Sequence, residues 1–421
     1  MLPNNINVNK TRSLLFLFTI FIILVAMVPY VFFGINFFID QWNIAIDPPG
    51  FYDSRQLAWA AESYYRGYDP MVENPANPRG LQINYPRIWY LLFPLIIDES
   101  RTNILGTIIV LIFFTGVGIF WFSHKFDNLT YYMLSIIILS PAVMLGIERA
   151  NNDLIIFFIL ALALTICNYA KITGFVLFII ASVLKIFPVF GFSYLLKEEK
   201  RNFFKFFLIA SGVFILYALL SLNDFSQIFK ITSKGVSSSY GLNVWWWSIK
   251  HHRYFNHPIS GTQALIFQIS SYVAAVIIVA ATLLFGMRPR DNGLHNPGKY
   301  IDSFRVGATI YSTTFLIMNT NDYRLLFLIF TIPQLVAWAR DKHNDLSFIS
   351  RIILPLMVFS LWSNFVMRFL GRKITFVMEE FTNWLMLAGL LYLLFSSLPN
   401  WFKDYIRRPF SFMKSSGSEP I

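Results

Sequence analysis

Long apolar runs separated by short polar segments dominate the chain. A helix of about 20 apolar residues crosses the roughly 30 Å hydrocarbon core of a bilayer. The pattern therefore predicts an all-α polytopic membrane protein. The first run is longer than the ~7–15 apolar residues of a signal peptide, so we expect it to be a spanning helix. The apolar runs are 14–38, 102–123, 129–147, 154–170, 204–222, 264–285, 303–319, 323–338, 349–367 and 381–399.

Two polar stretches, 39–100 and 223–262, interrupt the apolar pattern and are rich in Trp, Tyr, Pro and Gly. Cytoplasmic loops of membrane proteins carry an excess of Lys and Arg. Basic residues therefore predict that both polar stretches are outer loops of a plasma-membrane protein and that both termini are cytoplasmic. We expect short juxtamembrane helices within the first loop. The segments that carry the basic residues are 197–205, 286–302, 339–348 and the tail from Lys403.

The orientation of the middle of the chain stays open. In one arrangement 87–97 spans the membrane and 171–197 is a single helix. In the other, 87–97 lies at the outer interface and 171–197 is a hairpin with its tip near Lys185. The second is favoured because a Lys beside Pro188 is costly in lipid unless it lines a polar cavity, and broken helices are tolerated there. Both arrangements give about twelve crossings, counting spans of ~20 residues.

Composition excludes most soluble classes. Of the 421 residues, 56% are hydrophobic and only 14% are charged, whereas soluble domains have about 25% charged residues. The formal net charge of +11 comes from basic residues in inter-helix loops, so we expect a lipid bilayer and no nucleic acid as partner. The single cysteine, Cys167, excludes an intramolecular disulfide and a cysteine-based zinc site. We expect no metal and no other cofactor.

The first outer loop holds a candidate catalytic carboxylate. Asp53 follows Pro48-Pro49-Gly50 and precedes an amphipathic helix, Leu57–Tyr65, which Gly67 and Pro70 are expected to end. A carboxylate in such a loop at the membrane face can act as a general base if it reaches a hydroxyl and is partly shielded. The alternative is a solvated Asp that caps the helix.

Several short motifs together resemble the polyprenyl-phosphate-dependent GT-C glycosyltransferases, and most closely the mannosyltransferase-like family 87. They cover most of residues 14–285. The Gly-Gln of the family's Gly-Gln-x-Asn-Asp-Leu segment is replaced here. The motifs are Asp53 after the first helix, the Ala60-Ala61 helix, Gly67-x-Asp69-Pro70, Tyr85-Pro86, the Glu148–Leu154 segment and Ala181-x-x-x-Lys185-x-x-Pro188.

The resemblance implies a GT-C fold in which Asp53 is the catalytic base. It also implies that the loop after the third helix lies on the outer side, which supports the second arrangement. We divide the chain into a GT-C catalytic membrane module, 1–285, and C-terminal helices with a cytoplasmic tail, 286–421.

Transfer from a lipid-phosphate donor needs cations or hydrogen-bond donors for the departing phosphate. Lys185 is the strongest candidate, with snorkelling to the interface as the alternative. Arg324 is expected to pair with its neighbour Asp322. For substrate contacts we select polar and aromatic residues of the outer loops. The phosphate candidates are Lys185, His251, His252, Arg149 and Arg324, and the substrate candidates are Asp153, Asn152, Tyr85, Asn243 and Trp245.

The sequence thus predicts an integral membrane hexosyltransferase. It would move a monosaccharide, such as mannose, from a polyprenyl-phosphate donor to a glycolipid or cell-surface glycan, with inversion of the anomeric centre. One alternative is a transporter or flippase of lipid-linked sugars, although its paired broken helices would occur in both halves of the chain. Another is a polymerase or ligase of surface polysaccharide.

Overall fold

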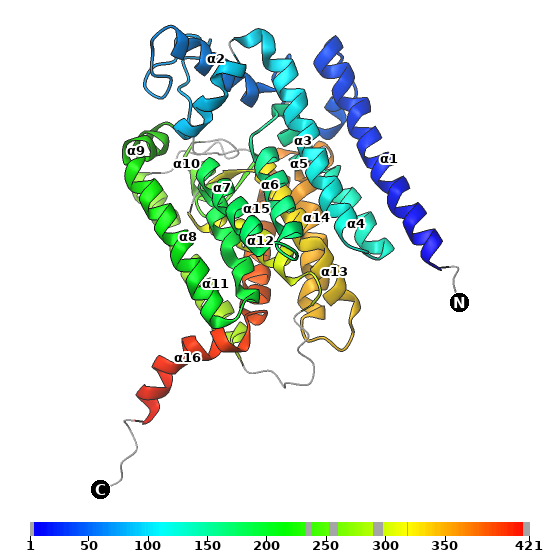
Figure 1. Cartoon of the computed structure of the whole chain (residues 1–421), viewed down its shortest axis with the longest axis vertical. Coiled ribbons are helices and arrows are strands. Elements are labelled where there is room, and N and C mark those ends of the chain that lie inside the picture. Colours follow the sequence, from blue (N-terminus) through cyan, green and yellow to red (C-terminus); the bar gives the residue numbers. More distant parts are fainter. Residues whose placement is uncertain are drawn as a thin grey trace.

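The computed structural model describes residues 4–96, 98–232, 238–251, 260–288, 298–317 and 319–415. The chain is mostly helical, and one two-stranded sheet occurs among the described residues. A bundle of long helices forms the body (Figure 1). The first polar stretch gathers around α2 at one end, and α16 leaves the body at the opposite end.

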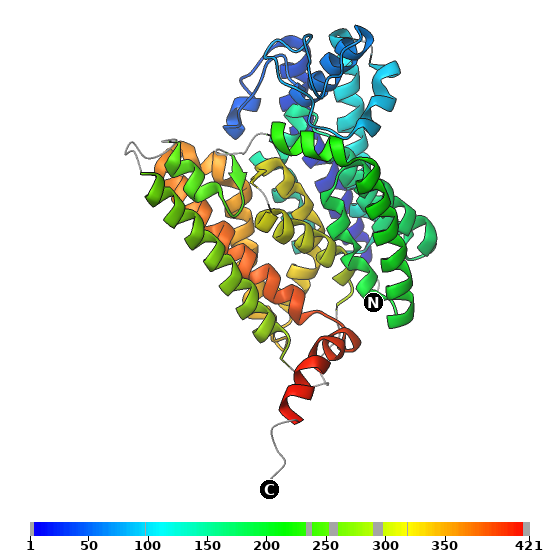
Figure 2. The same ribbon diagram turned by 90° about the vertical axis from the view of Figure 1, so that its left-hand side faces the viewer.

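Seven described helical segments are long and apolar enough to cross a membrane. They form the multi-pass architecture that the apolar runs predict. Most bury one face inside the protein, whereas α8 and α11 stand at its periphery and expose large apolar side chains (Figure 2). The segments are α1 (Asn4–Phe33), η3 with α3 (Glu99–Arg101, Thr102–Ser123), α8 (Lys200–Leu220), α11 (Gly261–Gly286), η5 with α13 (Asp322–Thr331, Ile332–Arg340), α14 (Ser347–Leu370) and α15 (Arg372–Ser396).

Other predicted runs are broken or short. The run 129–147 divides into α4 (Asn128–Ile138) and α5 (Pro141–Arg149), which meet at 52° and would make an eighth span if counted as one. Proline lacks the N–H that would continue the first helix, and Ser140 caps the second by accepting from Val143 N. The total of twelve crossings stays a prediction. The shorter helices are α6 (Asp153–Ile166), α7 (Lys171–Leu184), α9 (Leu222–Ile231), α10 (Val244–Lys250), α12 (Ile301–Ile317) and α16 (Asn400–Ser415).

The first polar stretch contains the expected short helices, η1 (Ile39–Trp42), α2 (Tyr52–Tyr65) and η2 (Arg87–Leu95). Helix α2 ends before Gly67, which has the positive φ of 88° expected there. Apolar side chains of α2 and η2 share a small core of their own. Because a nine-residue 3₁₀ helix rises only about 18 Å, η2 is too short to span, and it lies against the end of α7 through Trp89.

The segment 171–197 is a hairpin, as in the second arrangement. Helix α7 and the 3₁₀ helix η4 (Phe187–Lys197) pack together. The open ends of the hairpin, away from its tip, are joined by an ion pair between Lys171 and Glu198 at 2.8 Å. Lys185 has an extended backbone at the tip, directly after α7 ends. A polar turn therefore projects toward the end of the body that carries α2.

A two-stranded sheet joins the second polar stretch to the centre of the body. Strand β1 (Ser239–Tyr240) pairs antiparallel with β2 (Thr320–Asn321), with Tyr240 opposite Thr320. The following 3₁₀ helix, η5, has buried side chains on nearly all sides and packs on α12 and α5. The sheet thus fixes the start of η5 beside the hairpin tip and the loop after α5.

Candidate functional site

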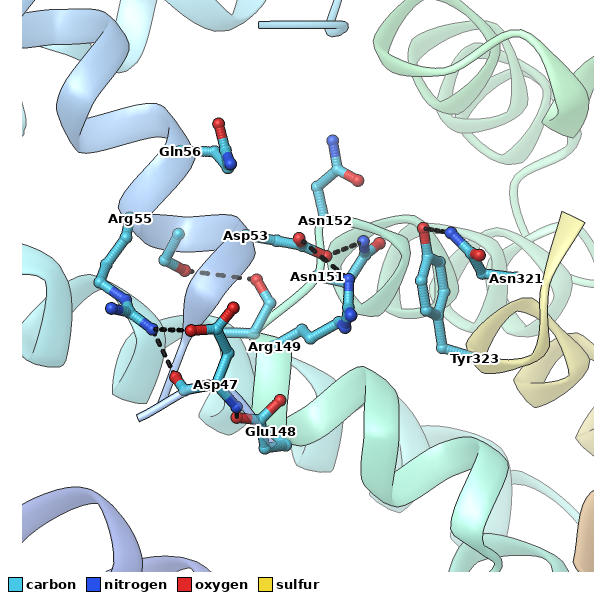
Figure 3. Close-up of polar contacts among 12 residues, drawn as sticks. Asp47, Asp53, Arg55, Gln56, Glu148, Arg149, Asn151, Asn152, Asn321 and Tyr323 are labelled. Atoms are coloured by element: carbon cyan, nitrogen blue, oxygen red, sulfur yellow. Dashed lines mark hydrogen bonds and ion pairs between the residues drawn. The ribbon is translucent and has the colours of Figure 1, made fainter. Parts of the chain in front are cut away.

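Asp53 lies in the first turn of α2, where the loop after α5 packs against it (Figure 3). Its side chain is 11% exposed. Asn151 donates to Asp53 Oδ2 at 2.5 Å, and Arg149 Nη1 lies 3.8 Å from Oδ1. The N-cap of α2 is Phe51, so the idea that Asp53 caps a helix beginning at Leu57 is wrong. The carboxylate instead faces a neighbouring segment, partly shielded from solvent.

A buried network fixes the turn that carries Asp53. The backbone N–H of Phe51 donates to the Glu148 carbonyl at 2.7 Å. Glu148 Oε1 accepts from the Tyr30 hydroxyl at 2.9 Å and from Asp47 N at 3.1 Å. Arg55 reaches back from α2 to the Asp47 carbonyl at 2.5 Å. Helices α1, α2 and α5 are thereby tied together beneath Asp53.

Lys185 lies at the centre of a second group of contacts. It binds Asp153 and Asn152 Oδ1, and its Nζ is 3.5 Å from Asn151 Oδ1. The Lys185 side chain is only 14% exposed, so its ammonium group is held inside the protein by these contacts and does not extend into the surroundings. Because Asn151 also donates to Asp53, one asparagine connects the candidate base to the buried cation.

Arg324 completes this group from η5. Its Nε donates to Asp153 Oδ2 at 3.1 Å, and the guanidinium carbon lies 4.4 Å from the centre of the Phe187 ring. The expected pairing with Asp322 is therefore wrong. Asp153 is fully buried and lies between the two cations. We call Asp153, Lys185 and Arg324 the cationic triad.

Tyrosines flank the group formed by Asp53 and the cationic triad. Lys185 Nζ lies 5.7 Å from the centre of the Tyr85 ring. Burial, followed by the charge of Asp53, raises the pKa of the Tyr85 phenol well above its usual value, so Tyr85 stays a neutral hydroxyl. Tyr323 projects from η5 on the far side of Asn151, and its hydroxyl accepts from Asn321 at 3.1 Å.

The structure brings most predicted site residues together and separates the others. Asp53, Tyr85 and Arg149 lie with Asn152 and the cationic triad. The described residues of the second polar stretch have contacts elsewhere, with one another or with α15. Asn243 accepts from Trp246 at 2.7 Å, Trp245 stacks on Phe376, and His251 stacks on Trp247. His252 lies outside the described residues.

Sequence reasoning missed several buried polar residues. Asn151, Glu148 and Tyr323 connect or support the site, and the polar run 148–153, from the end of α5 to the start of α6, was the available signal for the first two. A second group, Asp322, Glu379 and Glu380, lies between η5 and α15. Two adjacent glutamates in an otherwise apolar helix could have pointed to it.

We call Asp322, Glu379 and Glu380 the acidic group. Each is at most 6% exposed, and Glu379 and Glu380 are adjacent residues of α15. Glu379 accepts from the Ser363 hydroxyl at 2.8 Å. Within the described part of the chain, neither oxygen of Asp322 nor Oε2 of Glu380 has a hydrogen-bond partner, and no Lys or Arg forms an ion pair with the group.

Among the described residues, no set of three or more His, Cys, Asp or Glu side chains is arranged to hold a metal ion. What the site offers is a shielded carboxylate beside buried cations. Such an arrangement can accept a proton and bind an anion within one small volume.

Comparisons with protein-family models, curated proteins and solved structures find no significant match to this chain.

Proposed function

We propose that the chain is an integral membrane glycosyltransferase. It transfers a monosaccharide from a polyprenyl-phosphate donor to a hydroxyl of a glycolipid or cell-surface glycan, with Asp53 as general base. The observation that carries the proposal is the connection from Asp53 through Asn151 to Lys185 and the rest of the cationic triad. It supplies a base and a phosphate site side by side.

The chemistry needs both parts. The acceptor oxygen forms a bond to the anomeric carbon while its proton passes to an Asp53 oxygen. The bond from that carbon to the phosphate oxygen breaks, and its electron pair stays on the phosphate. Buried cations stabilise the charge that develops on the leaving phosphate. One direct displacement inverts the anomeric centre and requires only one carboxylate.

Lys185 is the residue best placed to meet the phosphate. Its three N–H groups face oxygens of Asn151, Asn152 and Asp153, as expected for an ammonium group. A phosphate oxygen replaces an asparagine amide oxygen at this position. Arg149 faces Asp53 from the other side and orients the carboxylate toward the acceptor.

The proposed location follows from the basic loops. Lys200 and Arg201 begin α8, and Arg340 ends α13, at the end of the body away from α2. The positive-inside rule assigns that end to the cytoplasm. The site and its lipid-linked donor then lie at the outer face of the plasma membrane, with both termini inside.

The test is transfer by the full chain in lipid nanodiscs, supplied with labelled polyprenyl-phosphate sugars and a glycolipid extract. Asp53→Asn keeps the shape of the side chain and its contact with Asn151, but it removes the base. We expect transfer to fall by about 10²–10⁴-fold. Asp40→Asn is the matched control, because Asp40 is an exposed carboxylate in the same polar stretch, and it should transfer like the native chain.

Full activity of Asp53→Asn would exclude Asp53 as the base. If the native chain moves none of the labelled sugars to an acceptor, the transferase proposal fails. Movement of an intact lipid-linked sugar between bilayer leaflets of proteoliposomes, without transfer, would identify a flippase instead.

A further inference from the structure

The Asp153 carboxylate is not accessible to a ligand, because it is buried and both of its oxygens are already paired. It is fully buried as the first residue of α6. Lys185 occupies its Oδ1 and Arg324 its Oδ2, the latter at 3.1 Å. Its backbone N–H donates to Asn151 Oδ1 at 2.8 Å. A substrate hydroxyl has no open approach to this carboxylate, so Asp153 acts through the two cations that it holds.

Asp153 also sets the charge of the cationic triad. Lys185 and Arg324 contribute two positive charges and Asp153 one negative charge, which leaves one positive charge. A sugar linked to a lipid through a single phosphate is a phosphodiester with one negative charge. A diphosphate-linked sugar carries two. The single positive charge of the triad therefore neutralises a monophosphate-linked donor. A diphosphate-linked donor would keep one uncompensated negative charge in a shielded site, which is unfavourable.

We propose that Asp153 is a positioning residue that makes the site specific for donors with one phosphate. It orients Lys185 and Arg324 and limits their combined charge. The proposal rests on the proposed function. During transfer the phosphodiester becomes a phosphomonoester and gains one negative charge. Asp53 accepts a proton in the same step and loses its negative charge. The total charge around the triad is then unchanged, and the product phosphate is not held by excess positive charge.

Ligand binding to the purified full chain in detergent micelles tests this role without sugar transfer. The two probes share one prenyl chain: methyl farnesyl phosphate carries one charge, and farnesyl diphosphate carries more. Asp153→Asn leaves the triad with two positive charges. We expect its dissociation constant for farnesyl diphosphate to fall about tenfold, with a smaller change for methyl farnesyl phosphate, because Coulomb attraction grows with ligand charge.

A substitution that adds a negative charge, instead of removing one, distinguishes an effect of charge on binding from an effect of structural damage. Asn152→Asp adds a carboxylate at an atom that already contacts Lys185, and we expect about tenfold weaker binding of farnesyl diphosphate. The control is Asp302→Asn, which removes a partner of Lys197 at 3.3 Å, at the far end of the hairpin from Lys185. It should change neither probe.

Three outcomes overturn the proposal: an unchanged ratio of the two constants in Asp153→Asn, weaker binding of both probes in both variants, or an equal shift in the control. Should Asp153→Asn fail to fold, the ratio measured for Asn152→Asp decides alone. The transfer assay is independent. If the ratio of the two dissociation constants shifts but the native chain transfers no sugar, the effect of Asp153 on the charge of the site stands and the proposed function is rejected.

Discussion

Two groups of buried ionisable residues each include one sequence neighbour of Tyr323, Arg324 in the cationic triad and Asp322 in the acidic group, and they differ in their partners. In the cationic triad, Asp153 lies between Lys185 and Arg324, and both of its oxygens are bound. In the acidic group, Asp322 lies near Glu379 and Glu380, and no described cation pairs with any of the three. Both groups are largely shielded from solvent, and the clearest difference between them is that only the triad contains cations paired with its carboxylate.

This difference separates two uses of buried charge. A buried ion pair that loses one partner leaves an uncompensated charge, which costs about 3–5 kcal/mol. A buried carboxyl group without a partner already destabilises the fold through its lost hydration. Replacing it by an amide that cannot ionise therefore removes part of that desolvation cost. The triad should therefore be sensitive to neutral substitutions, and the acidic group tolerant of them.

The largest effect is expected for Lys185→Met, which removes one cation of the triad and leaves Asn152 and Asp153 without this partner. We expect a loss of about 3–5 kcal/mol in the free energy of unfolding. Unfolding of the detergent-solubilised chain by urea, extrapolated linearly to zero denaturant, measures it.

Lys171→Met is the matched control for this lysine. Lys171 also pairs with a carboxylate, that of Glu198 at 2.8 Å, but the Lys171 side chain is 60% exposed although Glu198 is only 7% exposed. Because water reaches this pair from the lysine side, we expect its loss to cost about 0–1 kcal/mol, as for surface ion pairs. Equal losses in the two variants would contradict the distinction between a buried and a partly exposed pair.

Asn151→Ala should have the next largest effect. It removes the donor to Asp53 and the acceptor for the Asp153 N–H. Hydrogen bonds to charged groups contribute about 1.5–3 kcal/mol, and we expect a loss of unfolding free energy in that range. Transfer should fall further than the folded fraction does, since Asp53 loses its orientation. A variant that is destabilised but retains full activity per folded molecule would show that Asn151 only supports the fold.

The fold was predictable from the sequence wherever apolar runs are uninterrupted. Spans near α1, α3 and α14 follow directly from such runs. The predicted run 381–399 begins nine residues after the start of α15 at Arg372, because the uninterrupted apolar run starts only after Glu379 and Glu380. Interior packing accommodates both glutamates, and local hydropathy carries no information about that packing.

The candidate site was predictable in its charged members but not in its pairings. Asp53 stood out as a carboxylate in a Pro- and Gly-rich loop at the membrane face, and Lys185 stood out because a charge within apolar sequence is costly. The partner of Arg324 was wrongly assigned to Asp322, two positions earlier, because its actual partner, Asp153, is 171 positions away. Asn151 carries no charge and gave no signal of its own. Such long-range contacts depend on how η5, α5 and α7 converge.

Ser363→Ala tests the hydrogen bond that Ser363 donates to Glu379 of the acidic group. The Ser363 hydroxyl donates to Glu379 Oε1 at 2.8 Å. Its removal leaves a buried acceptor without that donor, and we expect a loss of about 1–2 kcal/mol in unfolding free energy. Ser363→Thr keeps the hydroxyl and should retain most of the stability. A loss as large as that of Lys185→Met would show that the acidic group is as interdependent as the triad.

Glu380→Gln should have the smallest effect, and its sign is the sharpest test of the comparison. Glu380 is 2% exposed, and its Oε2 has no hydrogen-bond partner within the described residues. An amide of the same shape replaces the Glu380 carboxyl near Glu379 and Asp322 with a group that cannot ionise, without opening a cavity, so we expect unfolding free energy to change by less than about 1 kcal/mol or to rise. The ratio of dissociation constants for the two farnesyl probes should stay that of the native chain, because Glu380 makes no contact with the triad. A loss of about 3 kcal/mol or more would mean that the carboxylate is compensated as Asp153 is, and the two groups would then differ in position alone.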